Sequence, residues 1–186
     1  LKYQWSTSAT TEPTGLETDG TEFESGETIE KPNGTGTYYL WVTAQDNIGN
    51  TTVTHSEAFY VDNTLPTITV TVEEDENKEN VEITVAQADV GGGLDTTRNT
   101  NESRNQYYLS TSDTSLVGGS WNNYSSGGKI TVPVGTYYLY LKSIADIAGN
   151  ISQANGTLTT IDGITYHRFG PYTVEAGAPK LTINAQ

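Results

Sequence analysis

The pentapeptide Gly-Thr-Tyr-Tyr-Leu occurs twice in the chain, at residues 36–40 and at residues 135–139. A polar turn follows each copy: Asp-Asn-Ile-Gly-Asn at residues 46–50 and Asp-Ile-Ala-Gly-Asn at residues 146–150. A motif that recurs together with its neighbour indicates an internal repeat. We therefore expect one structural unit to be present twice.

The residues around the motif repeat as well. Tyr-Gln-Trp-Ser-Thr-Ser at 3–8 parallels Tyr-Tyr-Leu-Ser-Thr-Ser at 107–112, and Val-Asp-Asn-Thr-Leu-Pro at 61–66 parallels Val-Glu-Ala-Gly-Ala-Pro at 174–179. The offset grows from 99 at the pentapeptide (135 minus 36) to 113 at the closing proline (179 minus 66). The second copy therefore carries an insertion.

Strand periodicity runs through both copies. Apolar residues alternate with Thr from Ile68 to Val72, and with polar residues from Val81 to Val85. Tyr38, Leu40 and Val42 alternate in the same way with the residues between them. Such alternation predicts strands with one face packed and the other in water. No segment has the pattern of a helix, so the predicted fold class is all-β.

These patterns divide the chain into three parts. Residues 64–176 form a complete unit, with strands expected at 67–73, 81–87, 106–111, 128–133, 136–145 and 171–175. Residues 1–63 begin at the strand equivalent to 106–111, so this copy lacks its first two strands. Residues 177–186 are the start of a further repeat or a linker. The chain is accordingly interpreted as a fragment of a longer protein.

The motifs resemble those of a known family. Tyr-x-Leu-x-Val-x-Ala, then Asp-x-x-Gly-Asn, then Val-Asp-Asn-Thr-x-Pro is similar to the bacterial immunoglobulin-like (Big-type) repeats of large cell-surface adhesins, and the strand is similar to that of fibronectin type III domains. The resemblance implies tandem antiparallel β-sandwiches, with Trp5 and Leu109 in the core. It also implies an extracellular location on a bacterial surface, with adjacent repeats of the same chain as partners.

Composition narrows the function classes. The 186 residues carry a net charge of −14 with only nine Lys and Arg, and no Cys. Nucleic-acid binding needs clustered cations, so it is not expected. Cys-ligated metals are excluded, and no apolar run is long enough to predict membrane insertion. An acidic run, Glu73 to Glu79, is expected to be a solvated hairpin tip.

The first polar turn has two interpretations. Calcium takes six to eight oxygen ligands, and Asp46, Asn50, Asp62 and Asn63 offer several of them. Adhesin repeats that depend on calcium clamp their junctions with similar carboxylates. In the second interpretation the Asp side chain caps the backbone of its own turn, which Asx residues do routinely. Gly49 and Gly149 are expected to adopt positive φ in these turns.

The insertion in the second copy predicts a hairpin near 155–169. Asp-Gly at 162–163 lies between alternating runs, which is a strong hairpin signal. Tyr166, His167, Arg168 and Phe169 follow it and concentrate residue types that are common in binding sites. They are either a recognition loop or a longer strand that packs on its own domain or on the next repeat.

The repeat accounts for nearly every patterned residue, and no catalytic motif is present. The first hypothesis is therefore a non-catalytic stalk or spacer module of an adhesin, which presents or spaces a binding region. The alternative is a ligand-binding module that recognises a host protein or a glycan through the inserted hairpin. A third hypothesis is assembly by strand donation, in which an incomplete sandwich edge accepts a strand from another copy.

Overall fold

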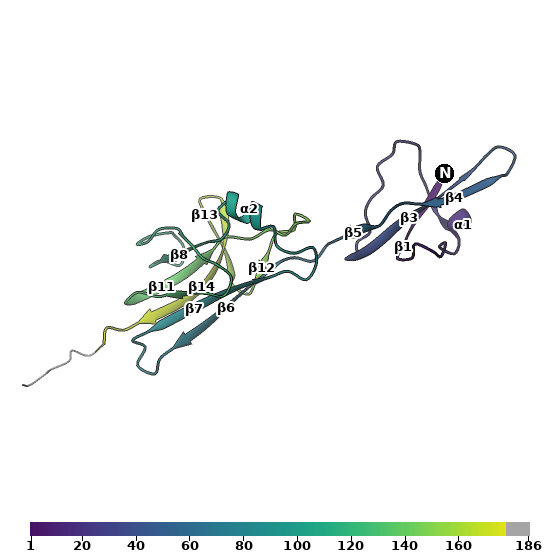
Figure 1. The fold of residues 1–186 in the computed structure, drawn as a ribbon. Coiled ribbons are helices and arrows are strands. Elements are labelled where there is room, and N and C mark those ends of the chain that lie inside the picture. Colours follow the sequence, from purple (N-terminus) through teal and green to yellow (C-terminus); the bar gives the residue numbers. More distant parts are fainter. Residues whose placement is uncertain (178–186) are drawn as a thin grey trace, which may run out of the picture. The chain divides into compact units, whose positions relative to one another are not determined.

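The computed structural model describes residues 1–177, and its strands pair antiparallel except for β12 with β6 (Figure 1). The chain divides into two compact units, unit 1 (Leu1–Thr64) and unit 2 (Leu65–Gln186). The all-β prediction is confirmed. Two short helices, α1 (Leu16–Asp19) and α2 (Thr96–Asn101), were not predicted from the sequence. The tail predicted to start a further repeat lies, from residue 178 onward, outside the described residues.

Unit 1 contains one antiparallel sheet with the order β2-β1-β3-β4, and β5 pairs with the start of β3. Its strands are β1 (Lys2–Ser6), β2 (Thr21–Glu22), β3 (Gly36–Gln45), β4 (Thr51–His55) and β5 (Phe59–Val61). The long strand β3 is therefore the centre of the unit, because every strand except β2 is hydrogen-bonded to it.

The burial of the two faces of β3 is the reverse of the prediction. Trp41 and Thr43, on the face expected to meet water, are 7% and 6% exposed. Leu40 and Val42, on the face expected to pack, are only half-buried. The reason is non-local: the segment that contains α1 folds over the Trp41 face, where the indole Nε1 donates to the Ser8 carbonyl at 2.9 Å.

Unit 2 has two sheets, as in a sandwich. One has the order β10-β7-β6-β12, and the other β13-β14-β11-β8-β9. The bounds are β6 (Thr67–Glu74), β7 (Val81–Ala88), β8 (Gln106–Ser110), β9 (Asn122–Asn123), β10 (Gly128–Thr131), β11 (Gly135–Leu141), β12 (Gln153–Ala154), β13 (Thr157–Ile161) and β14 (Ile164–Val174). Each of the six predicted strands of this unit coincides with a strand or part of one, although 136–145 ends early, at Leu141.

The main core of unit 2 lies between the sheets. It consists of buried aliphatic residues from both: Ile68, Val81, Ile83, Val85, Ile130, Val132, Leu139, Leu141, Ile144 and Val174. On β7 the predicted alternation is confirmed, since Val81, Ile83 and Val85 are fully buried. On β6 burial fades from Ile68, at 2% exposed, to Val72, at 37%, as the strand approaches the hairpin tip.

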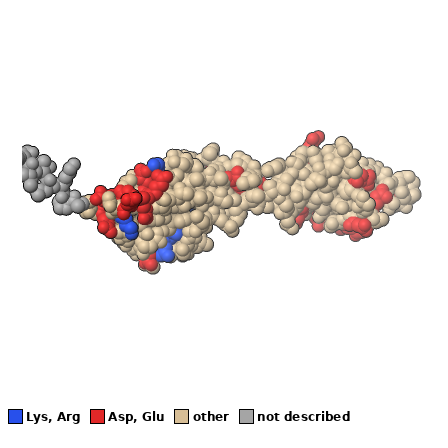
Figure 2. All heavy atoms as spheres, turned by 90° about the horizontal axis from the view of Figure 1, so that it is seen from below, with Lys and Arg blue, Asp and Glu red and all other residues tan. Residues whose placement is uncertain are grey.

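The tip of the β6–β7 hairpin is acidic and exposed. Figure 2 shows acidic side chains gathered at one end of unit 2, with a few Lys and Arg among them. Lys129 lies 2.5 Å from the Glu82 carboxylate and 3.5 Å from that of Glu73. Exposed pairs of this kind contribute little to stability. The prediction of a solvated tip is confirmed.

A second apolar cluster lies on the outer face of the five-stranded sheet. Tyr108, Tyr140, Ile161 and Tyr166 are buried there, with Trp121, Tyr138 and Leu116 packed against them. The loop that follows β8 holds this cluster: the Tyr140 hydroxyl donates to the Ser112 carbonyl at 3.0 Å, and that of Tyr108 to Gly119 at 2.9 Å. Strand β11 is consequently buried on both faces.

The predicted turn geometry is confirmed. Ile161 pairs with Ile164 across a two-residue loop, in which Asp162 has φ 51° and Gly163 φ 79°. Both positive values match the turn that suits the twist of a hairpin. Gly49 and Gly149 have φ 93° and 92°, as their turns require.

The fully buried positions of β7 should dominate the stability of unit 2. Val85→Ala is expected to lower the free energy of unfolding by about 2 kcal/mol, because two carbons are removed from a packed core. Val72→Ala, on the adjacent strand at 37% exposure, is the matched control. Urea unfolding followed by Trp121 fluorescence, the sole indole of unit 2, measures both. Equal losses would contradict the assigned core.

Candidate functional site

The first polar turn is capped by its own aspartate. Asp46 Oδ1 accepts hydrogen bonds from the backbone N–H groups of Ile48 (3.0 Å) and Asn50 (2.9 Å), and Oδ2 accepts one from Asn50 Nδ2 (2.9 Å). These bonds, the Asn50 side chain first, hold the pKa of the Asp46 carboxyl below its ordinary value. The arrangement corresponds to the turn-capping interpretation of this motif.

The other two predicted metal ligands lie at the opposite end of β3. Asp46 directly follows this ten-residue strand, whereas Asp62 directly follows Val61, which pairs with Gly36 at its beginning. At about 3.3 Å per residue the two ends are roughly 30 Å apart. Asp46 and Asn50 therefore do not share one ion with Asp62 and Asn63.

Asp62 and Asn63 have local partners of their own. The Asp62 carboxylate accepts hydrogen bonds from the backbone N–H and the hydroxyl of Thr64, at 2.9 and 2.5 Å. Asn63 Nδ2 donates to the Pro32 carbonyl at 3.1 Å. These contacts fix the chain where it leaves β5.

The second polar turn is built like the first but is buried. Asp146 is 0% exposed and accepts from the backbone N–H and side-chain Nδ2 of Asn150, at 2.8 and 2.7 Å. The segment that precedes α2 lies against it, because Leu94 forms a bridge with Asp146 and the Ile147 N–H donates to the Gly93 carbonyl at 3.0 Å. The identical motif thus has a different environment in the two units.

A second carboxylate, which the sequence did not single out, lies beside this turn. Asp89 follows β7, and its Oδ2 accepts from the backbone N–H groups of Gly91 (3.2 Å) and Gly93 (2.8 Å). Its Oδ1 is buried and has no hydrogen-bond partner. Carboxylate oxygens of Asp89 and Asp146 lie within 4.8 Å of each other. An Asp two residues before the run Gly91 to Gly93 was the available sequence signal, since glycine amides readily surround a carboxylate.

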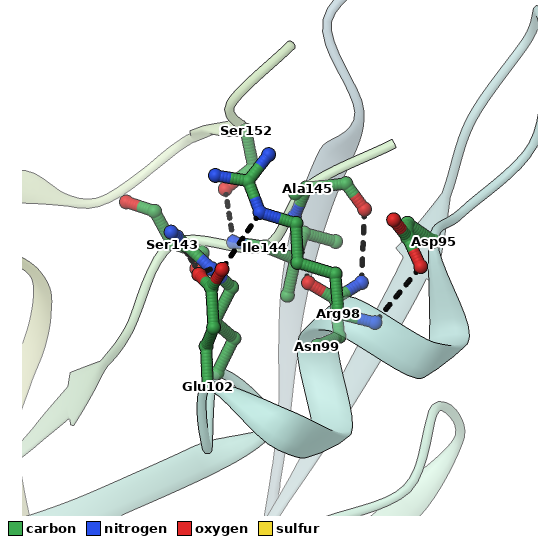
Figure 3. Close-up of polar contacts among 9 residues, drawn as sticks. Asp95, Arg98, Asn99, Glu102, Ser143, Ile144, Ala145 and Ser152 are labelled. Atoms are coloured by element: carbon green, nitrogen blue, oxygen red, sulfur yellow. Dashed lines mark hydrogen bonds and ion pairs between the residues drawn. The ribbon is translucent and has the colours of Figure 1, made fainter. Parts of the chain in front are cut away.

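Helix α2 fixes the chain ahead of the buried turn (Figure 3). The side chain of Asp95 caps the helix by accepting from the Arg98 N–H at 2.8 Å. Asn99, 2% exposed, then makes two bonds with one residue: its Nδ2 donates to the Ala145 carbonyl at 2.9 Å, and the Ala145 N–H donates to its Oδ1 at 2.8 Å. The buried Asn99 amide thus satisfies both backbone groups of Ala145, which pairs with Ile151 only through an isolated bridge.

Further polar contacts extend this clamp. Glu102 lies between Arg98 and Arg104, at 3.0 and 2.6 Å from their Nε atoms, and Arg104 Nη1 donates to the Ser143 carbonyl at 3.1 Å. Hydrogen bonds from Arg104 and then Arg98 lower the pKa of the Glu102 carboxyl. The Ile144 N–H donates to Ser152 Oγ at 2.9 Å, as Figure 3 also shows. All these contacts hold the segment between β11 and the Asp146 turn.

The four predicted ligand-binding residues lie on β14, inside the five-stranded sheet. Tyr166 is 5% exposed and packs beside Trp121, with ring centroids 5.3 Å apart. Arg168 lies over the Tyr138 ring and donates to the Asp113 carbonyl at 2.6 Å. Phe169 packs against the main core. Of the two interpretations, the geometry corresponds to the longer strand that packs on its own domain.

His167 is the most enclosed titratable side chain of this group, at 3% exposure. Its Nε2 lies 3.0 Å from Ser143 Oγ, and its Nδ1 is buried without a hydrogen-bond partner. Burial lowers the pKa of this imidazole, because the charged form loses hydration. His167 is therefore a neutral packing residue at pH 7.

Comparison with known proteins adds no assignment. The chain matches no protein-family model, and no similar protein was found among curated proteins or solved structures. Within residues 1–177, no helix has the length and apolar character needed to cross a bilayer.

The buried imidazole predicts a pH dependence. The pKa of His167 is lowered in the folded state, so below about pH 6.5 the unfolded chain binds the extra proton and stability falls with falling pH. Between pH 7 and pH 5 unit 2 should lose stability with a slope of at most about 1.4 kcal/mol per pH unit. His167→Gln should remove this component, and His55→Gln, in unit 1, should retain it. Urea unfolding at each pH, followed by Trp121 fluorescence, is the measurement. An unchanged slope in His167→Gln would contradict the assignment.

The carboxylates also predict where added calcium acts. Asp46 already uses both oxygens within its turn, whereas Asp89 Oδ1 accepts no hydrogen bond. In a calcium titration followed by amide NMR, the resonances of Asp89 and Asp146 should shift, and those of Asp46 and Asn50 should not. Asp89→Asn should abolish the shifts, and Asp46→Asn should leave them in place. Shifts confined to the Asp46 turn would reverse this conclusion.

Proposed function

We propose that the chain is a non-catalytic module of an extracellular bacterial surface protein, an adhesin or stalk made of tandem immunoglobulin-like sandwich repeats. In this role each unit spaces or presents a binding region, and its partners are the adjacent repeats of the same chain. Repeat proteins of this kind gain length by stacking copies of one unit.

One observation carries the proposal: the two units pair their strands in the same register. Trp5 pairs with Leu40 in unit 1, and the repeat-equivalent Leu109 pairs with Leu139 in unit 2. Likewise Gly36 pairs with Val61, and Gly135 with Val174. The sequence repeat and the shared pairing register both support the proposal that the two units are copies of one design.

The same comparison explains the insertion. In unit 1, β3 turns directly into β4, whereas in unit 2 β12 and β13 intervene before β14 returns to pair with β11. Arg168 pairs with Tyr140 where His55 pairs with Trp41. The segment 166–169 therefore corresponds to the return strand of unit 1, and the added part is residues 151–163.

The chemistry of the side chains supports a structural role. His55 and His167 lie in different units, and His167 is buried in a sheet. Asp46 and Asp146 each accept hydrogen bonds from the backbone N–H and the side-chain amide of the Asn in their own turn. Recognition of a host protein or glycan through the inserted hairpin has less support, because Tyr166 to Phe169 contact their own domain.

A spacer must resist pulling along its length, which gives a direct test. Unit 2 should unfold in one discrete force peak, because all eight residues of β6 pair with β7 and the main core links both sheets. The released length should be about 350–400 Å, for 110 residues (174 minus 65, plus 1) at about 3.5 Å each. Atomic-force pulling of the full chain measures it.

Val85→Ala, which creates a cavity in this core, should lower the peak force and leave the released length unchanged. The exposed variant Val72→Ala is the matched control. A smooth extension without a force peak for unit 2 would reject the spacer role.

A further inference from the structure

The apolar face of the unit 1 sheet is covered less than its counterpart in unit 2. Leu40 and Val42 are half-buried, whereas the residues at the equivalent positions of β11, Leu139 and Leu141, are 0% exposed. The difference cannot come from the residue types, because both pairs are aliphatic and occupy the same register. It comes from what lies over them.

The open face, as we call this surface, is continuous across three strands of unit 1. It consists of Tyr3, Trp5, Tyr38, Leu40, Val42 and Phe59, which are paired across β1, β3 and β5. Trp5 packs edge-on against Tyr38 and Phe59, with ring centroids 6.5 and 5.7 Å apart. Phe59 is nevertheless 49% exposed. Both hydrophobic core clusters found among the described residues belong to unit 2.

Unit 2 shows what covers such a face. There β7 contributes three fully buried residues to the main core, together with Ile68 of β6. Leu109, Tyr137 and Tyr172, the counterparts of Trp5, Tyr38 and Phe59, pack against that cluster. Within the sheet that covers this face, the β6–β7 hairpin thus supplies an antiparallel strand pair with β-branched residues on its inner face.

A segment at the edge of the open face has a counterpart in unit 2. In unit 2, residues 129–133 read Lys-Ile-Thr-Val-Pro, and β10 pairs there with β7, Ile130 opposite Ile83. In unit 1, residues 28–32 read Thr-Ile-Glu-Lys-Pro and form no strand. The Trp5 Nε1 donates to the Glu30 carbonyl at 3.0 Å, which fixes this segment beside the open face. Residues 28–31 therefore correspond to β10, but unit 1 as described has no strand that corresponds to β7.

We propose that the open face of unit 1 binds a two-stranded antiparallel sheet of the β6–β7 type, with one strand paired to residues 28–31. The partner has β-branched apolar residues on its inner face and Thr or charged residues on its outer face. Strand addition then supplies backbone hydrogen bonds, and the alternating apolar side chains supply the packing. This inference rests on the proposal that the two units are copies of one sandwich.

The test uses the full chain with a copy of residues 65–104 added directly before Leu1. That junction preserves the spacing of unit 2, because Tyr107 lies three residues after Arg104, as Tyr3 would lie three residues after the added Arg. Hydrogen exchange should slow at least tenfold at the amides of residues 28–31, and binding of a hydrophobic dye should fall. The matched control carries Ile83→Thr and Val85→Thr within the added copy, which keeps the β-branched shape and removes the apolar surface.

Equal exchange at residues 28–31 in the two extended proteins would overturn the proposal. A second arm avoids the fusion: a synthetic peptide of residues 65–88 should displace the dye from the unmodified chain, and the doubly Thr-substituted peptide should not. Failure of both arms while unit 2 keeps its force peak rejects the docking surface alone. Loss of the force peak with docking intact would reject the spacer role instead.

Discussion

The packing of β11 on both faces is the constraint on which the rest of unit 2 depends. Leu139, Tyr140 and Leu141 are consecutive and fully buried, so neighbouring side chains enter the main core and the aromatic cluster in turn. A strand with no solvent-exposed face needs partners for its backbone groups at both edges, and β8 and β14 are these partners. The loop after β8 is part of the same requirement, because without its cover Tyr140 would meet water.

The segment that follows β11 is also held in place by buried contacts. Beyond Leu141 the chain leaves the sheet, and Asn99 of α2 takes over as the partner of Ala145. The Asp146 turn follows immediately, and its carboxylate is buried beside Asp89. Unit 1 has the same turn motif without an equivalent helix, and there Asp46 is exposed. A shared sequence motif therefore provides the same turn but not the same electrostatic environment.

The strands were predictable because their information is local. Alternation identified β6 and β7, the repeated pentapeptide identified β3 and β11, and Asp162-Gly163 identified the inserted hairpin. Features that depend on distant segments were not: the burial of Trp41 follows from the chain around α1, and the role of Asp89 follows from a turn more than fifty residues away. The four predicted metal ligands do not come together for the same reason. The sequence shows two motifs, but it does not show that they lie at opposite ends of β3.

The segment between β2 and β3 has a consequence for limited proteolysis. Residues 23–35 form no strand and are largely exposed, which are the features of a preferred cleavage site. A cut there would leave β1 attached to β3 through five residue pairs, so the nicked protein would keep its native size and separate only on denaturation. The rate of that cleavage would also report on the open face, since a sheet paired to residues 28–31 would shield the bond from the protease.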